Sequence, residues 1–412
     1  MSRPKVYVIC FLFSIASQAF ERPSLPHLDL QMSGSEYFGM MKNRHDGEGN
    51  HELDPVIRMG NRLFNWLRLI NHKRPEEKKL SLSNPENQPG YPIESPKVSS
   101  PKIILNQFKQ LKVELPAPIA KEVFGNHELT EFCSMSDEDF VLWGRRIDEL
   151  YGAASRWLLQ EPMLWGYAAK RRSDIRGYYL LTHTPNIEAV LAHWKDLDDE
   201  QKNKLRVALK GLCQNSGETD TFCEGGLSET DQTEKTPLIY FNTYLPHGKA
   251  RWDELFMISQ KREDIEWHSP SESLLYMPFE KPESEEVLSF LKENIEDEWR
   301  WSGWALKLNF IKGDWNTTHV EFIPGSTPHV NGLAGSTITM DANQPLTEYH
   351  VRWTIRHEFG HTLGFPDCYV EFYEPKQHEM ISYQVDTTNL MCSRRGKLQE
   401  KHFLELKRVY YQ

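Results

Sequence analysis

Residues 357–367 read HEFGHTLGFPD, and this stretch contains the residues that most strongly indicate a function. If this stretch begins as a helix, His357 and His361 are four residues apart and project from one face. Two neutral imidazoles at that spacing can bind one Zn²⁺ ion at about 2.0–2.1 Å. Glu358 lies beside the first histidine, where a carboxylate can act as a general base on water at the metal. The stretch therefore predicts a metal site with an acid–base group next to it.

The residues after His361 predict a third ligand. Gly364 can end the helix in a left-handed conformation, and Pro366 stiffens the returning chain. Asp367 then offers an oxygen ligand. Three protein ligands with one open position are typical of a catalytic zinc site rather than a closed structural one. The alternative for the two histidines alone is a pair of surface side chains, and Gly364 and Asp367 argue against it.

A second motif follows, because residues 388–392 read TNLMC. The pattern HExxHxxGxxD followed by a methionine turn resembles the metzincin metallopeptidases, in the form where aspartate replaces the third histidine, as in the snapalysin-like families. The resemblance implies that Met391 forms a hydrophobic floor beneath the metal; an ordinary core methionine is the alternative. Ser393 stands where some metzincins, astacins among them, carry a tyrosine that assists at the oxyanion, so that role is not transferred.

This resemblance implies a zinc-dependent metalloendopeptidase that acts on a protein or peptide substrate. It implies one catalytic Zn²⁺ held by His357, His361 and Asp367, with Glu358 as general base. A non-catalytic secreted binding protein that keeps a metzincin fold is the alternative, and it would be expected to lack the glutamate or a ligand.

A rival set of ligands also stays open. In another zincin clan the third ligand would be a glutamate further along, such as Glu371, Glu374 or Glu379. Gly364 and the methionine turn would then have no explanation.

The first residues resemble a secretory signal peptide. A basic start, with Arg3 and Lys5, precedes a short apolar run over residues 6–15 and small residues that end at Ala19. That run is too short to span a bilayer, and no later segment approaches about 20 apolar residues. We expect cleavage near Ala19 and a secreted or periplasmic protein. The net charge of −11 argues against nucleic acid or an anionic membrane as the main partner.

A chain of 412 residues is long enough for two or three domains. After the signal peptide, residues 1–19, we expect an N-terminal segment with one helix over residues 20–71. Proline and polar residues predict a linker over residues 72–101. Residues 102–230 show helical periodicity and predict a helical accessory domain or pro-domain, without a motif that carries chemistry. Ser136, Pro185 and the pair Asp198 and Gln201 are expected to begin helices in this region.

Residues 237–412 predict an α+β domain. Apolar runs indicate strands at residues 238–241, 274–277, 306–311, 320–323 and 337–340, and an amphipathic helix at 284–299. The zinc-binding helix is expected to begin at Thr347 as its N-cap. The resemblance implies a metzincin-like catalytic domain with a mixed sheet, a backing helix, the active-site helix and the methionine turn. By the same analogy, residues 332–339 would be the edge strand that pairs with an extended substrate.

Five cysteines remain after removal of the signal peptide, and disulfides are the default in an exported protein. Cys213 and Cys223 bracket a short polar loop, which predicts that they pair with each other. The resemblance implies that the segments around Cys368 and Cys392 lie close together under the metal, so a bridge between them would fix the floor of the site. Two free buried thiols are the alternative.

Cys133 is left without a partner. One hypothesis is a cysteine switch, as in matrixins, in which a pro-domain thiolate occupies the zinc and keeps a zymogen latent. The residues around Cys133 do not match the matrixin motif, and a buried free cysteine is the alternative.

Overall fold

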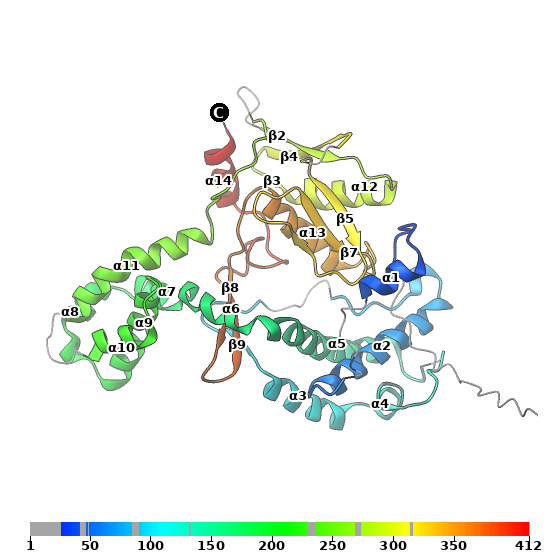
Figure 1. Ribbon diagram of the computed structural model, residues 1–412, viewed down its shortest axis with the longest axis horizontal. Helices are drawn as coiled ribbons and strands as arrows, with labels where there is room; N and C mark the ends of the chain where they lie inside the picture. Colours follow the sequence, from blue (N-terminus) through cyan, green and yellow to red (C-terminus); the bar gives the residue numbers. More distant parts are fainter. Residues whose placement is uncertain are drawn as a thin grey trace, which may run out of the picture.

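The computed structural model describes residues 26–41, 47, 49–84, 90–131, 133–228, 236–267, 273–313 and 316–411. The expected signal peptide lies outside these residues. Figure 1 shows a mixed α+β structure whose N-terminal part is mainly helical. In the part of the chain that is described, the strands form three small three-stranded sheets, and no helix is both long and apolar enough to cross a membrane.

The first group of helices packs around one apolar core that includes Trp66, Phe140 and Trp157. One helix was expected over residues 20–71, but the structure has two there, at residues 34–41 and 54–72, and the longer one belongs to this group. The Ser136 hydroxyl accepts a hydrogen bond from the Asp139 backbone, which confirms Ser136 as an N-cap. The helices of this group are α2 (Asp54–His72), α3 (Pro101–Glu114), α4 (Ala117–Phe124), α5 (Asp137–Gln160) and α6 (Leu164–Ala169), and α1 (Gly34–Met41) precedes them in the chain.

A second group of helices has its own core around Leu209, Leu212 and Phe241. The disulfide between Cys213 and Cys223 is present and joins two of these helices. The group consists of α7 (Arg176–His183), α8 (Ile187–Ala192), α9 (Asp199–Gln214), α10 (Asp220–Ser228) and α11 (Thr236–Glu254). Short single turns connect the helices at Glu76–Lys78, Glu161–Met163, Lys170–Ser173 and Trp194–Asp196.

Two expectations in this region are wrong, and one is confirmed. Asp198 and Gln201 form the predicted capping box of α9. Pro185 does not begin a helix, because Asn186 adopts a left-handed conformation and α8 starts only at Ile187. The strand expected at residues 238–241 is part of α11. A run of four apolar residues does not distinguish a strand from one buried helical turn.

The C-terminal part contains two sheets that a backbone bridge between Phe279 and Thr318 joins side by side. One sheet has the order β2–β4–β3 and the other the order β5–β7–β6, and the pairs β2–β4 and β5–β7 are parallel. The strands predicted from residue 274 onward are confirmed. They are β2 (Leu274–Glu280), β3 (Arg300–Trp301), β4 (Trp304–Ile311), β5 (His319–Ile323), β6 (His329–Val330) and β7 (Thr337–Asp341).

The predicted backing helix is α12 (Glu285–Leu291), which continues as a π-helical turn over Lys292–Glu296. The expectation for residues 332–339 is wrong, since β7 is paired on both sides and β6 is the outer strand. Trp299 and Trp304 are buried in the core of this C-terminal part, which the strands and α12 share with α14 (Glu400–Tyr410).

A third sheet connects the two parts of the molecule. Strands β8 (Tyr369–Glu374) and β9 (Glu379–Gln384) form an antiparallel hairpin, and β1 (Lys97–Ser99) pairs with β9. In Figure 1 this hairpin extends from the C-terminal part to lie between the two groups of helices. Residues 97–99, expected in a linker, therefore form a strand of this sheet.

Candidate metal centre

The helix α13 (Tyr349–Thr362) carries the two histidines. It begins one residue later than expected, because Glu348 rather than Thr347 is the N-cap. Ile355 and Phe359 on one side are fully buried in the C-terminal core. His357 and His361 lie on another face of the helix. The same helix therefore anchors itself in the core and presents the two imidazoles.

The chain reverses direction immediately after α13. Gly364 has a φ of +91°, as predicted, and a Cβ at this position would overlap the Gln260 carbonyl oxygen. The Gly364 backbone donates to the carbonyl of His361 at 3.0 Å, and that of Phe365 donates to the carbonyl of Gly360 at 3.1 Å. This turn brings Asp367 back toward the histidines.

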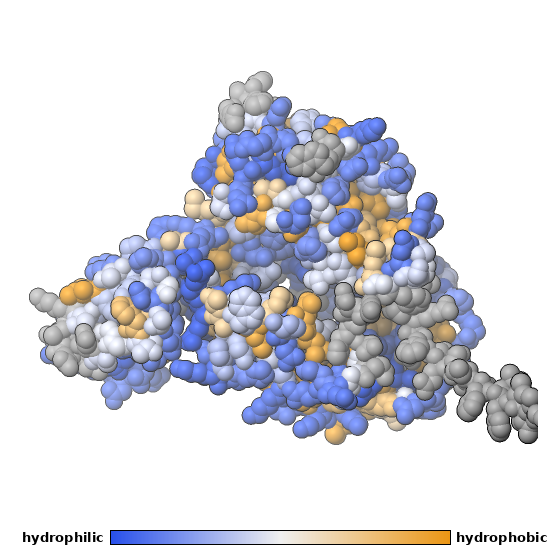
Figure 2. Space-filling model, in the orientation of Figure 1, coloured by the Kyte–Doolittle hydropathy of each residue, from blue (hydrophilic) through white to orange (hydrophobic). Residues whose placement is uncertain are grey.

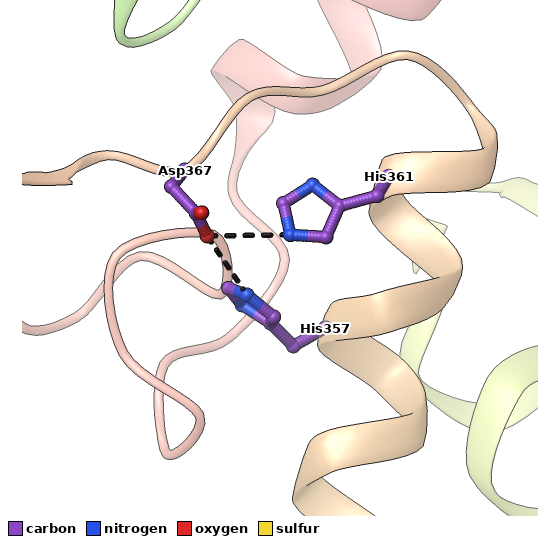
Figure 3. Close-up of side chains that lie close together, drawn as sticks. All are labelled: His357, His361 and Asp367. Carbon is purple, nitrogen blue, oxygen red and sulfur yellow. Dashed lines mark hydrogen bonds and ion pairs between the residues drawn. The ribbon is translucent and has the colours of Figure 1, made fainter. Parts of the chain in front are cut away.

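Figure 3 shows the two imidazoles and the Asp367 carboxylate pointing toward one another. The Oδ1 atom of Asp367 lies 3.1 Å from Nε2 of His357 and 3.2 Å from Nε2 of His361. One ligand atom from each of the three residues lies within 4.8 Å of the others, and among the described residues no other such group is found. Ligands bound at about 2.05 Å to a tetrahedral Zn²⁺ ion are separated by about 3.3 Å. The group could therefore hold a metal ion, and its two nitrogens and one oxygen suit zinc.

Backbone carbonyls fix which nitrogen of each imidazole faces the site. Nδ1 of His357 lies 3.0 Å from the carbonyl oxygen of Leu390, and Nδ1 of His361 lies 2.7 Å from that of Phe365. A carbonyl oxygen can only accept, so both Nδ1 atoms donate. When a ring is neutral, its lone pair is therefore on Nε2, the nitrogen that faces the centre of the group, which is the tautomer that a metal requires.

Without a metal, the three side chains form a charged cluster. Burial lowers the pKa of His361, but the hydrogen bond and the negative charge of Asp367 outweigh burial and raise this pKa to about 9. Burial raises the pKa of Asp367, but the two imidazoles outweigh it and hold this pKa well below its usual range. The aspartate is therefore ionised at neutral pH, as a metal ligand must be.

Glu358 is 5% exposed and follows the first histidine on α13. Its negative charge contributes to the raised pKa of His361, which places the carboxylate near the group. Within the described part of the chain, no residue forms a hydrogen bond or ion pair with its side chain. A buried carboxylate usually has such a partner. Glu358 is thus free to receive a proton from a molecule in the site.

The methionine turn packs directly against α13. Met391 is buried, and a Cβ on Gly360 would overlap its sulfur. The contact of Gly360 with Met391 was not predicted, because a glycine inside a helix was the only sign of it in the sequence. The Asn389 Oδ1 atom accepts hydrogen bonds at 2.8 Å from the Met391 backbone and from Nε2 of His402, so it holds the turn in place.

A disulfide ties this turn to the segment that carries Asp367. The predicted bond between Cys368 and Cys392 is present, and the Cys368 backbone donates to the carbonyl of Met391 at 3.1 Å. The third residue of the metal group and the methionine turn are therefore fixed to each other by one covalent bond and one hydrogen bond.

The remaining candidate residues are not brought to the group. Cys133 is a half-buried free thiol that packs against the core of the first group of helices. The alternative ligands lie along the hairpin. Glu371 pairs with Arg156 at 2.9 Å and Glu374 with Arg171 at 2.9 Å, while Glu379 begins β9.

Comparisons of the chain with protein-family models, curated proteins and solved structures find no match. The assignment of the site therefore depends on its own residues and geometry.

Proposed function

We propose that the protein is a zinc-dependent metalloendopeptidase of the metzincin type. The observation that carries the proposal is the convergence of His357, His361 and Asp367 with Glu358 beside them. Both imidazoles are held by backbone carbonyls in the tautomer that binds a metal, and the carboxylate of Glu358 has no partner in the described protein. This combination of three ligands and one free base is what metal-assisted peptide hydrolysis needs.

Each residue has a distinct role in this proposal. His357, His361 and Asp367 hold Zn²⁺, which would supply Lewis acidity toward the scissile carbonyl and toward water. Glu358 takes a proton from the attacking water and later delivers it to the leaving amine. Met391 and Gly360 support the turn of α13 that carries His361. The outer edge of β6 would pair with the main chain of an extended substrate.

The alternative, a secreted binding protein that keeps the fold without activity, is less favoured by the site. A protein that only binds has no need of a carboxylate beside three metal ligands that forms no hydrogen bond or ion pair within the described structure. The two disulfides suit an extracellular protein under either proposal.

Zinc analysis combined with one substitution tests the proposal. The purified protein should contain one zinc ion per chain and hydrolyse a general peptide substrate. Glu358→Gln should keep the zinc and the melting temperature but lower hydrolysis by several powers of ten. Glu200→Gln removes the same charge from an exposed position on α9 and should leave hydrolysis unchanged. Full turnover by Glu358→Gln, or a chain that binds no zinc, would refute the proposal.

A further inference from the structure

One face of α13 extends beyond the metal ligands. His350, Trp353, His357 and His361 follow one another at intervals of three or four residues, so they share this face. Trp353 is half-buried, and the guanidinium of Arg395 lies over its ring at 5.6 Å. The face thus continues from the metal group toward the beginning of the helix.

A face of α5 shows the same spacing. Arg145, Asp148, Gly152 and Arg156 are three or four residues apart. They lie opposite the apolar side of α5, whose residues, such as Ile147, pack into the helical core. This second face is therefore the one that α5 turns away from its own core.

The N-terminal end of this face of α5, at Arg145, is connected to the start of α13. Arg145 donates to the carbonyl oxygen of Ser83 at 3.0 Å, and the Ser83 hydroxyl lies 3.4 Å from Nδ1 of His350. Beside this contact, the Ser81 hydroxyl donates to Glu348 at 2.7 Å. Residues 81–83 thus link the two helices at this end.

The C-terminal end of this face of α5, at Arg156, is connected to the segment after Asp367. Arg156 forms an ion pair with Glu371 of β8 at 2.9 Å, four residues beyond Asp367. The metal group therefore lies between two connections from α5, one to the start of α13 and one to β8.

The stretch of α5 between these connections is open. A Cβ on Gly152 would meet no heavy atom within 4 Å. In the described structure the carboxylate of Asp148 forms no hydrogen bond or ion pair. Burial, and then the charge of Glu149, raise the pKa of Asp148 to about 6. Figure 1 shows α5 running below α13, and the surface in Figure 2 is hollowed between these upper and lower parts.

From this arrangement we infer that α5 is the second wall of the substrate cleft and that Asp148 binds a basic side chain of the peptide. The inference rests on the proposed peptidase function. Its basis is charge complementarity, since a half-buried carboxylate without a partner, on the face of α5 between the two connections, is best stabilised by a bound cation. Gly152, one turn further along α5, leaves room for the peptide beside that carboxylate. The mainly helical N-terminal part is then a component of the active site and determines specificity.

The test uses the full-length mature protein and quenched peptides that differ at a single position, as Lys, Gln or Glu. With the wild type, kcat/KM should favour Lys over Gln by about five- to tenfold at one position, as expected for one partly shielded charge pair. Asp148→Asn should reduce that preference to less than twofold, and Asp148→Lys should shift it toward Glu. Glu200→Gln, the matched control on α9, should keep the wild-type preference. A preference that is the same in wild type and Asp148→Asn would overturn the inference.

A binding measurement separates this inference from the proposed function. Glu358→Gln loaded with zinc should bind the Lys peptide more tightly than the Gln peptide in fluorescence anisotropy, and adding Asp148→Asn should remove the difference. If that difference is found although the wild type hydrolyses nothing, the assignment of α5 and Asp148 to the peptide-binding cleft is correct and the peptidase proposal fails. If the wild type hydrolyses peptides but Asp148→Asn changes neither binding nor kcat/KM, the peptidase proposal stands and the assignment of α5 to the cleft is wrong.

Discussion

Met391 packs against the backbone of α13 at Gly360, so that any side chain at this position would overlap the methionine sulfur. Trp299 closes the same space from another side. Gly360→Ala should therefore displace the methionine turn or the helix turn that carries His361. Overpacking of this kind costs about 1–3 kcal/mol. We expect a lower melting temperature and weaker zinc binding, measured by thermal unfolding and by competition with a chelator.

Gly152→Ala is the control for this substitution. Gly152 is also helical, but a Cβ there meets nothing within 4 Å. Alanine in an open helix position should stabilise the protein by about 0.5–1 kcal/mol, because glycine loses more conformational entropy on folding. Equal effects of the two substitutions would show that helix propensity, rather than contact with Met391, decides the result.

The metal group could be predicted from the sequence because its parts are close together in the chain. His357, His361 and Asp367 lie within eleven residues, and helix periodicity and one glycine turn fix how they meet. The consequence of Gly360 could not be predicted in this way. Its role depends on Met391, and nothing in the sequence near Gly360 shows that the methionine packs there.

The contacts between the helical part and the segments around the metal site also could not be predicted from the sequence. Arg156 reads as an ordinary surface cation on an amphipathic helix, and its partner Glu371 follows more than two hundred residues later. The pairing of β1 with β9 could not be predicted either, because a three-residue strand has too short a pattern to recognise. Local patterns predicted the elements, but such long-range contacts do not leave a periodic signal.

Removing Asp367 distinguishes the two sets of ligands. Asp367→Ala should weaken zinc binding by at least a hundredfold, because the metal loses one of its three protein ligands and the only one that is negatively charged. Glu379→Gln, which changes an alternative ligand at the start of β9, should leave zinc affinity unchanged. Direct titration with zinc measures both. Retained affinity in Asp367→Ala together with lost affinity in Glu379→Gln would instead favour a distant glutamate as the third ligand.

Zinc affinity should rise with pH up to about pH 9. In the metal-free protein, Asp367 raises the pKa of His361 to about 9, so this imidazole is protonated at neutral pH. Zinc binds only the neutral ring, and the proton must leave first. Below pH 9 the apparent dissociation constant should therefore increase about tenfold for each unit by which pH falls. In Asp367→Asn the negative charge is gone, and the pH at which affinity levels off should move down toward the ordinary histidine range. An affinity that is flat between pH 6 and 9 would contradict this.

The helical part should be required for the C-terminal part to fold, rather than act as a removable inhibitor. Met380 of β9 is buried in the core of the first helices, and the Tyr383 hydroxyl donates to Asp174 at 2.9 Å. A fragment of residues 237–412 would expose Met380 and leave β9 without β1. Trp299, by contrast, is already buried within the C-terminal core and does not need the helical part for its burial.

We therefore expect this fragment to be insoluble, or unfolded by circular dichroism and unable to retain zinc. In the full chain, Cys133→Ser should leave peptide hydrolysis unchanged, because the thiol packs against the helical core rather than joining the metal group. Hydrolysis by the fragment that is faster than by the full chain would instead identify the helical part as an inhibitory pro-domain. An increase in activity with Cys133→Ser would identify the thiol as the latency ligand. Because the fragment and the substitution test different contacts, a stable but slower fragment would exclude inhibition by the helices whatever the effect of the cysteine.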